Sequence, residues 1–124
     1  MIFLYLFSDP SDEKSYFIIG KDMDCPDGST LLGQYVAVLY DGKPYPGVVL
    51  DYDEQDIQVS CMHQIGRPKN ISEHRYFWPK PIEDICWYPL YNLVAVIPEP
   101  FSANGRHFQI DSSLWERLLT YLKH

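Results

Sequence analysis

Two cysteines and two histidines in the middle of the chain are the side chains best suited to chemistry. Cys61 and His63 are two residues apart, and His74 and Cys86 follow them. Thiolates and imidazoles bind zinc, but zinc ligands usually include a Cys-x-x-Cys pair, which this set lacks. A Cys–His nucleophile would need a third, orienting group and an oxyanion-binding site, and no neighbouring residues indicate either. We therefore predict no metal site and interpret the cysteines as buried thiols near surface histidines.

Other patterns of catalytic or cofactor-binding sites are also missing from the sequence. The acidic cluster between Asp51 and Asp56 lacks the glycine and the ligand periodicity of a calcium-binding loop. There is no glycine-rich sequence of the phosphate-binding type. We predict that the protein is not an enzyme, with no catalytic residues and no cofactor.

Two tyrosines stand at the two ends of a predicted hairpin turn. Asp41-Gly42 tolerates the positive φ angles of a tight turn, and runs of β-branched and aromatic residues flank it. Tyr40 precedes the turn and Tyr45 follows it closely. Tyrosine has a flat apolar face and a polar tip, so these rings can belong either to a core or to a recognition surface. The hairpin indicates a small β domain that binds a partner.

The strands that must position these tyrosines are short and closely spaced. We predict strands over residues 2–7, 16–19, 35–40, 45–52, 57–62, 76–78, 91–97 and 107–110, with a turn over 82–85. Short strands at this spacing, joined by tight turns, are typical of a small SH3-like barrel of five strands. The predicted fold is therefore mainly β, with an N-terminal β extension and a C-terminal helix.

The predicted helix follows Ser113, which forms a capping box with Glu116. Its apolar residues recur at helical spacing: Leu114, Trp115, Leu118, Leu119 and Leu122. We expect this stripe to pack on the barrel, and a partner interface is the alternative. The domain organisation is then an N-terminal extension over 1–30, a barrel over 31–98, and a turn, a short strand and the helix over 99–124.

Composition limits the class of partner. The chain has 124 residues, enough for one domain. Its net charge of −7 disfavours binding to a nucleic-acid backbone and favours basic partners.

The chain contains three widely spaced cysteines. This odd number fits free thiols in an intracellular, reducing compartment. The apolar segment 1–7 is too short to span a bilayer, so we expect no membrane association.

The order of several short motifs resembles the Tudor family of SH3-like chromatin-reader domains. The matching motifs are Gly33, the strand 36–40, Asp41-Gly42, the segment 45–49, a third strand that ends at Cys61-Met62, and the segment 83–87 followed by 91–96. The resemblance extends over residues 33–97, roughly half of the chain. It implies binding of methylated lysine or methylated arginine in an aromatic cage, where several ring faces attract the cation.

The resemblance assigns cage positions to particular residues. Tyr40 and Tyr45 match the aromatic residues on either side of the first turn, whereas Met62 and Ile65 stand where the family has two further aromatics. Phe77 and Trp78 are candidates for the missing walls. The complete candidate set is Tyr40, Tyr45, Phe77, Trp78 and Met62, with Asp41 and Glu83 as acidic support.

Three functional hypotheses follow. The first is a nuclear reader of a basic or methylated peptide such as a histone tail. The second is an adaptor or self-association domain with a degenerate cage, which uses the barrel edge, the N-terminal arm or the helix face. The third is nucleic-acid binding through residues 67–80, where Arg67, Lys69, Arg75 and Lys80 alternate with Tyr76, Phe77 and Trp78. The acidic total charge disfavours the third, and the sequence leaves the oligomeric state open.

Overall fold

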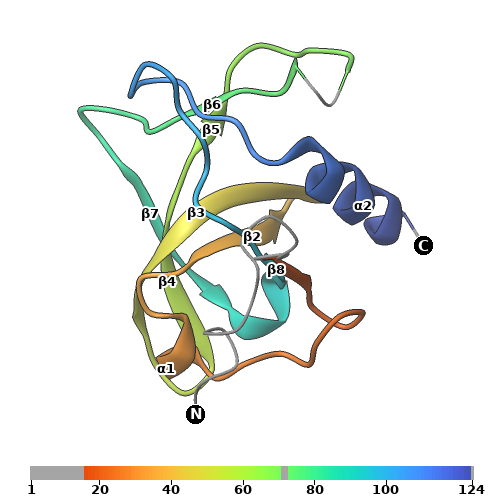
Figure 1. Ribbon diagram of the computed structural model, residues 1–124. Helices are drawn as coiled ribbons and strands as arrows, with labels where there is room; N and C mark the ends of the chain where they lie inside the picture. The colour runs from red at the N-terminus through yellow and green to blue at the C-terminus, as the bar shows by residue number, and fades with distance from the viewer. Residues whose placement is uncertain (1–15, 71–72, 124) are drawn as a thin grey trace, which may run out of the picture.

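The computed structural model describes residues 16–70 and 73–123, and its main element is a six-stranded antiparallel sheet (Figure 1). The strands pair in the order β1-β8-β2-β3-β4-β7. Their bounds are β1 (Phe17–Ile18), β2 (Tyr35–Tyr40), β3 (Lys43–Tyr52), β4 (Asp56–Cys61), β7 (Asp84–Pro89) and β8 (Leu93–Val96). The fold is thus mainly β, as predicted, and the strand predicted over residues 2–7 lies outside the described residues.

The remaining elements are short apart from one helix. They are α1 (Gly28–Leu31), the two-stranded ribbon of β5 (His63–Gln64) and β6 (Tyr76–Phe77), the 3-10 helix η3 (Leu90–Asn92) and α2 (Ser112–Leu122). Isolated bridges join Tyr76 to Phe108 and Phe101 to Gln109. The bridge to Tyr76 places Phe108 beside the ribbon, and the strand predicted over 107–110 is present only as single bridges at Phe108 and Gln109.

The sheet is not closed into a barrel, which corrects the predicted five-stranded closed sheet. Within the described residues, β1 and β7 are the two edges and no pairing joins them. The turn predicted over 82–85 is also wrong for its last two residues, Asp84 and Ile85. These residues begin β7, which pairs with β4 along its whole length. None of the β7 side chains is buried, so the strand lacks the alternation of buried and exposed residues that identifies a half-buried strand.

The predicted hairpin between β2 and β3 is confirmed. Asp41 and Gly42 have φ angles of 53° and 78°, and Tyr40 pairs with Lys43 across the turn. Positive φ at both central residues gives a turn whose twist matches that of the strands. The register continues to the pair of Tyr35 and Val48.

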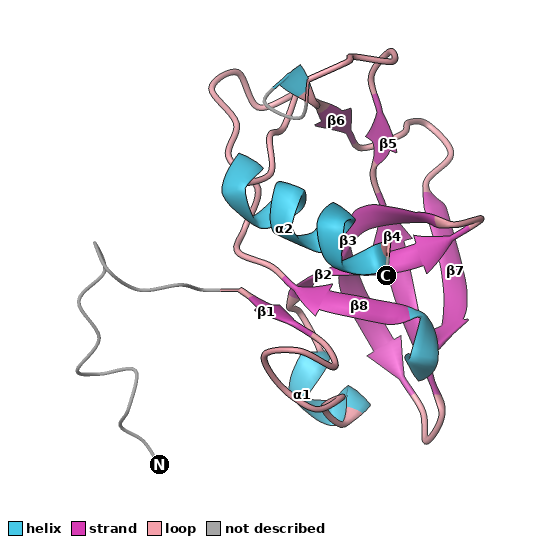
Figure 2. Cartoon of the chain, turned by 90° about the vertical axis from the view of Figure 1, so that its right-hand side faces the viewer, coloured by secondary structure: helices cyan, strands magenta, loops and turns pink. Residues whose placement is uncertain are grey.

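Two apolar clusters fill the two faces of the curved sheet. The first lies between the sheet and α2 and includes Ala37, Ala95, Leu114, Trp115 and Leu118. Figure 2 shows α2 lying across this face of the sheet. The second cluster lies on the opposite face, with Leu31, Val36, Val38, Val49, Ile57, Val59, Cys61 and Leu93. The apolar stripe of the helix is therefore covered by its own domain, as predicted.

Helix α2 starts at a different capping residue from the predicted one. The side chain of Asp111 accepts a hydrogen bond from the Leu114 backbone N–H at 3.0 Å, so Asp111 is the N-cap and Ser113 lies inside the helix. Asp is as good an N-cap as Ser, and Asp111 directly precedes the first helical residue, Ser112. Among the described residues, neither helix is long and apolar enough to cross a bilayer.

Candidate ligand-binding site

The tyrosines of the first hairpin lie at an open pocket of about 410 Å³. We call it the tyrosine pocket, and its walls include Tyr40, Tyr45, His63, Asp84, Cys86 and Tyr88. These residues come from β2, β3, β5 and β7, and Cys61 of β4 also contributes. Cys61 belongs to the second apolar cluster, so the pocket adjoins that core.

The hairpin register determines how the two tyrosines meet. Val38 pairs with Tyr45, and Tyr40 lies two residues beyond Val38 on the same face of β2. The ring centroids of Tyr40 and Tyr45 are 6.3 Å apart with an interplanar angle of 62°. Tyr40 is 60% exposed, whereas Tyr45 is partly buried. One ring is therefore accessible and the other is held by the sheet, and a cation between them can lie within about 6 Å of both centroids.

A histidine and a carboxylate form the polar wall of the tyrosine pocket. His63 Nε2 lies 2.8 Å from Asp84 Oδ2, and both side chains are partly exposed. Edge-to-face packing against Phe77, with the centroids 5.9 Å apart, supports the His63 ring. The register explains the pair, because Cys61 is opposite Asp84 and His63 begins β5 just beyond. The carboxylate gives the pocket an anionic group beside its aromatic rings.

The base of the tyrosine pocket is apolar and contains a thiol. Cys61 Sγ lies 3.6 Å from the Tyr88 hydroxyl, and Cys61 is only 2% exposed. Burial raises the pKa of the Cys61 thiol to about 11, against a smaller opposite effect of the Tyr88 hydrogen bond. Burial and the contact with Cys61 likewise raise the pKa of Tyr88. Both groups are therefore neutral at pH 7, and Asp84 is the anionic lining group.

We expect Cys61 to resist alkylation by iodoacetamide at pH 8 while the exposed Cys86 reacts. The thiolate is the nucleophile, and a pKa of about 11 leaves roughly one Cys61 thiol in a thousand ionised at pH 8. The rate of modification at Cys61 should continue to rise up to about pH 11. Peptide mass spectrometry over a time course measures both rates in the same sample. Equal rates at Cys61 and Cys86 would contradict this assignment.

The other predicted cage residues lie elsewhere. Met62 is fully buried in the cluster under α2, because strand alternation turns it away from the pocket face that Cys61 occupies. Asp41 is exposed in the turn and Glu83 lines a separate hollow with Leu50 and Trp78, so neither lines the tyrosine pocket. Sequence reasoning missed Asp84, His63 and Tyr88 as pocket residues.

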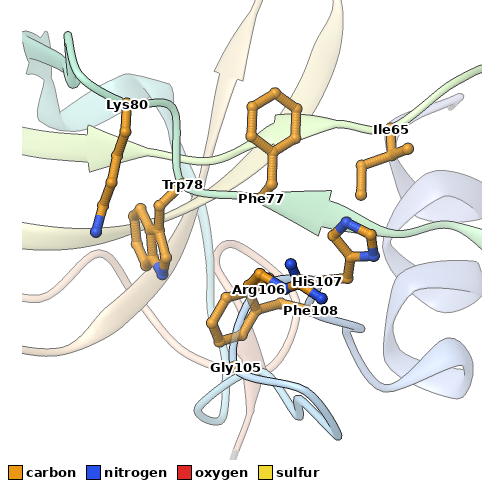
Figure 3. Close-up of a pocket in the computed structure, with 8 residues that line it drawn as sticks. All are labelled: Ile65, Phe77, Trp78, Lys80, Gly105, Arg106, His107 and Phe108. Carbon is orange, nitrogen blue, oxygen red and sulfur yellow. The ribbon is translucent and has the colours of Figure 1, made fainter.

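Phe77 and Trp78 line a second pocket, of about 460 Å³. We call it the basic aromatic pocket, and its main walls are Phe77, Trp78, Lys80, Arg106, His107 and Phe108. Figure 3 shows Phe77 and Trp78 pointing in opposite directions, as adjacent residues of an extended chain do. Neither residue lines the tyrosine pocket, so they do not join Tyr40 and Tyr45 in one cage.

The predicted basic and aromatic segment 67–80 does not form one continuous surface. Tyr76 is buried, and its hydroxyl accepts a hydrogen bond from the Trp115 indole at 3.0 Å. Arg67 lines a hollow near α2, and Arg75 lines another with Phe101. Lys80 belongs to the basic aromatic pocket.

In the part of the chain that the structure describes, no group of three or more His, Cys, Asp or Glu side chains is placed to hold a metal ion. The cysteines Cys25, Cys61 and Cys86 are free thiols.

Comparison with protein-family models, with curated proteins and with solved structures finds no match to this chain. The Tudor-like resemblance and the functions that it implies therefore stay predictions. What the protein binds must be argued from the two pockets themselves.

Proposed function

We propose that the tyrosine pocket binds a cationic side chain of a basic peptide, with methylated lysine or methylated arginine as its preferred ligand. The observation that carries this proposal is the presence of three tyrosines and the Asp84 carboxylate around one open pocket. A methylated cation is weakly hydrated and gains cation–π attraction from each ring that it faces. The carboxylate adds a charge partner and an acceptor for any remaining N–H group.

The charge of the whole chain supports a basic partner. A net charge of −7 attracts Lys- and Arg-rich segments over a distance of about one Debye length. Of the two pockets, only the tyrosine pocket includes a carboxylate among its lining residues. Histone tails are one class of peptide with this chemistry, and a reader of them would act in the nucleus.

The strand arrangement supports a Tudor-like relationship. Five consecutive antiparallel neighbours, β8-β2-β3-β4-β7, come from the segment that carries the resemblance. The first hairpin of that segment presents Tyr40 and Tyr45 where the resemblance implies the cage. We propose that the domain is an open relative of the SH3-like barrels in which Asp84 and Tyr88 complete the pocket.

The test is titration of the full chain with matched peptides that carry unmodified lysine, trimethyl-lysine, unmodified arginine or dimethyl-arginine. We expect methylated peptides to bind more tightly than their unmodified counterparts. Tyr40→Ala and Tyr45→Ala should each weaken binding by about 5- to 30-fold, since a cation–π contact contributes about 1–2 kcal/mol when partly desolvated. Isothermal titration calorimetry and NMR shift mapping measure the affinity and the site.

Tyr91→Ala is the matched control, because Tyr91 is 86% exposed and lies outside the pocket. The Tyr91→Ala protein should bind the methylated peptides with the same affinity as the protein of native sequence. Equal losses from Tyr91→Ala and Tyr40→Ala, or no binding at millimolar peptide, would refute the proposal.

A further inference from the structure

The basic aromatic pocket has basic side chains in its lining, although the protein as a whole is acidic. Lys80, Arg106 and His107 line it, and none of its eight lining residues is acidic. Within the described residues, Lys80 and Arg106 form no ion pair. Lys80 also lines the neighbouring hollow that contains Glu83, but it is not paired with that carboxylate, so both charges can reach a ligand.

The same pocket offers aromatic rings next to these charges. Trp78 and Phe108 meet edge to face, with their centroids 6.4 Å apart and their planes at 70°. Both rings are only partly buried. A flat ligand can therefore contact one ring while its charged part reaches Lys80 or Arg106.

The backbone holds the two sides of the pocket together. Tyr76 and Phe108 exchange a pair of backbone hydrogen bonds of 2.8 Å each, which joins β6 to the segment 105–108. The Asn104 side chain accepts hydrogen bonds at 2.8 Å from the backbone N–H groups of Arg106 and His107. Figure 3 shows Trp78 and Lys80 on one side of the pocket, and Arg106, His107 and Phe108 on the other. The backbone on the two sides of the pocket is thus held in place.

We propose that the basic aromatic pocket is a second binding site, separate from the tyrosine pocket, for a nucleotide unit, meaning a planar base joined to a phosphate. The base stacks on Trp78 or Phe108, and the phosphate is held by Lys80 and Arg106. A volume of about 460 Å³ is in the usual range for small-molecule sites. The unit is either a free nucleotide or one residue of a single-stranded nucleic acid. The small basic area on an acidic chain restricts contact to one or two nucleotides.

The test uses the full chain and a fluorescently labelled hexauridylate RNA, with hexathymidylate DNA, AMP, UMP and inorganic phosphate as competitors. We expect binding at low salt, with AMP or UMP competing better than inorganic phosphate because the base contributes. The double variant Lys80→Ala/Arg106→Ala should weaken RNA binding by at least about tenfold. It should also lower the slope of log affinity against log salt by about 0.7 for each phosphate that the protein no longer neutralises. Phe108→Ala should weaken binding by about tenfold with the slope unchanged.

Lys21→Ala/Lys123→Ala is the charge-matched control, since both lysines are exposed and lie outside the pocket. It should keep the affinity of the unmodified protein. Competition by AMP as strong as by either hexamer identifies a free nucleotide as the ligand, and much stronger competition by a hexamer identifies a single strand. The proposal is overturned if neither RNA nor a nucleotide binds, or if the control variant loses as much RNA affinity as Lys80→Ala/Arg106→Ala. It is also overturned if inorganic phosphate competes as well as AMP, or if a phosphotyrosine peptide binds more tightly than the RNA.

Discussion

Trp115→Ala is expected to lower the free energy of unfolding by about 3–5 kcal/mol, the usual cost of removing a buried large aromatic side chain. Trp115 is 2% exposed and lies in the cluster between α2 and the sheet. Its ring packs edge to face on Tyr76, with the centroids 6.0 Å apart, and its indole N–H donates to the Tyr76 hydroxyl. The substitution therefore removes apolar packing and leaves a buried hydroxyl without its donor. Urea unfolding followed by circular dichroism measures the change.

Tyr76→Phe is the control that separates the hydrogen bond from the packing. It keeps the ring contact but leaves the buried Trp115 indole N–H without its acceptor, so it should cost about 1–3 kcal/mol, less than Trp115→Ala. Glu116→Ala, on the exposed side of α2, should change stability by less than about 0.5 kcal/mol. If Trp115→Ala cost no more than Tyr76→Phe, α2 would not be held by this cluster.

Gly47→Ala is expected to destabilise the protein by about 3 kcal/mol or more, at or above the upper end of typical overpacking costs. Gly47 lies in β3 and pairs with both Val36 of β2 and Cys61 of β4. A Cβ atom at this position would lie 2.6 Å from the Ser60 carbonyl oxygen. Because that oxygen belongs to the backbone of the neighbouring strand, it cannot move aside without disturbing the sheet. Thermal and urea unfolding of the variant measure the loss.

Gly42→Asn is the matched control in the same hairpin. Gly42 has a φ of 78° and no heavy atom within 4 Å of an added Cβ. Asparagine tolerates this backbone conformation better than most residues, so the cost should stay below about 1 kcal/mol. A Gly47→Ala protein as stable as Gly42→Asn would show that β3 and β4 do not approach each other closely at Gly47.

The features that the sequence predicts correctly have local causes. The Asp41-Gly42 turn follows from the backbone preferences of two adjacent residues. The stripe of α2 follows from the spacing of apolar residues along one segment, and Leu114, Trp115 and Leu118 are buried as that spacing predicts. In β4, Ile57, Val59 and Cys61 share one buried face, which alternation also predicts.

The features that the sequence does not predict depend on contacts between distant segments. Tyr88 reaches Cys61 across 27 positions and Asp84 reaches His63 across 21, in both cases through strand register. The walls of the basic aromatic pocket are joined by the bridge between Tyr76 and Phe108, which no local pattern indicates. Long-range register is set by how whole faces pack, so single-segment patterns do not contain it.

By itself, the sequence determined a mainly β domain, its first hairpin with two flanking tyrosines, and a terminal helix with one apolar face. Each of these depends on turn chemistry or on periodicity within a few residues. Only the tertiary structure decided that the sheet is open, that Met62 is buried, and that Asp84 and Tyr88 accompany the tyrosines. It also decided that Trp78 faces Arg106 and Phe108 in a separate pocket. The reason is that which side chains share a pocket depends on strand pairing between segments far apart in the chain, and pairing is decided by the packing of the complete domain.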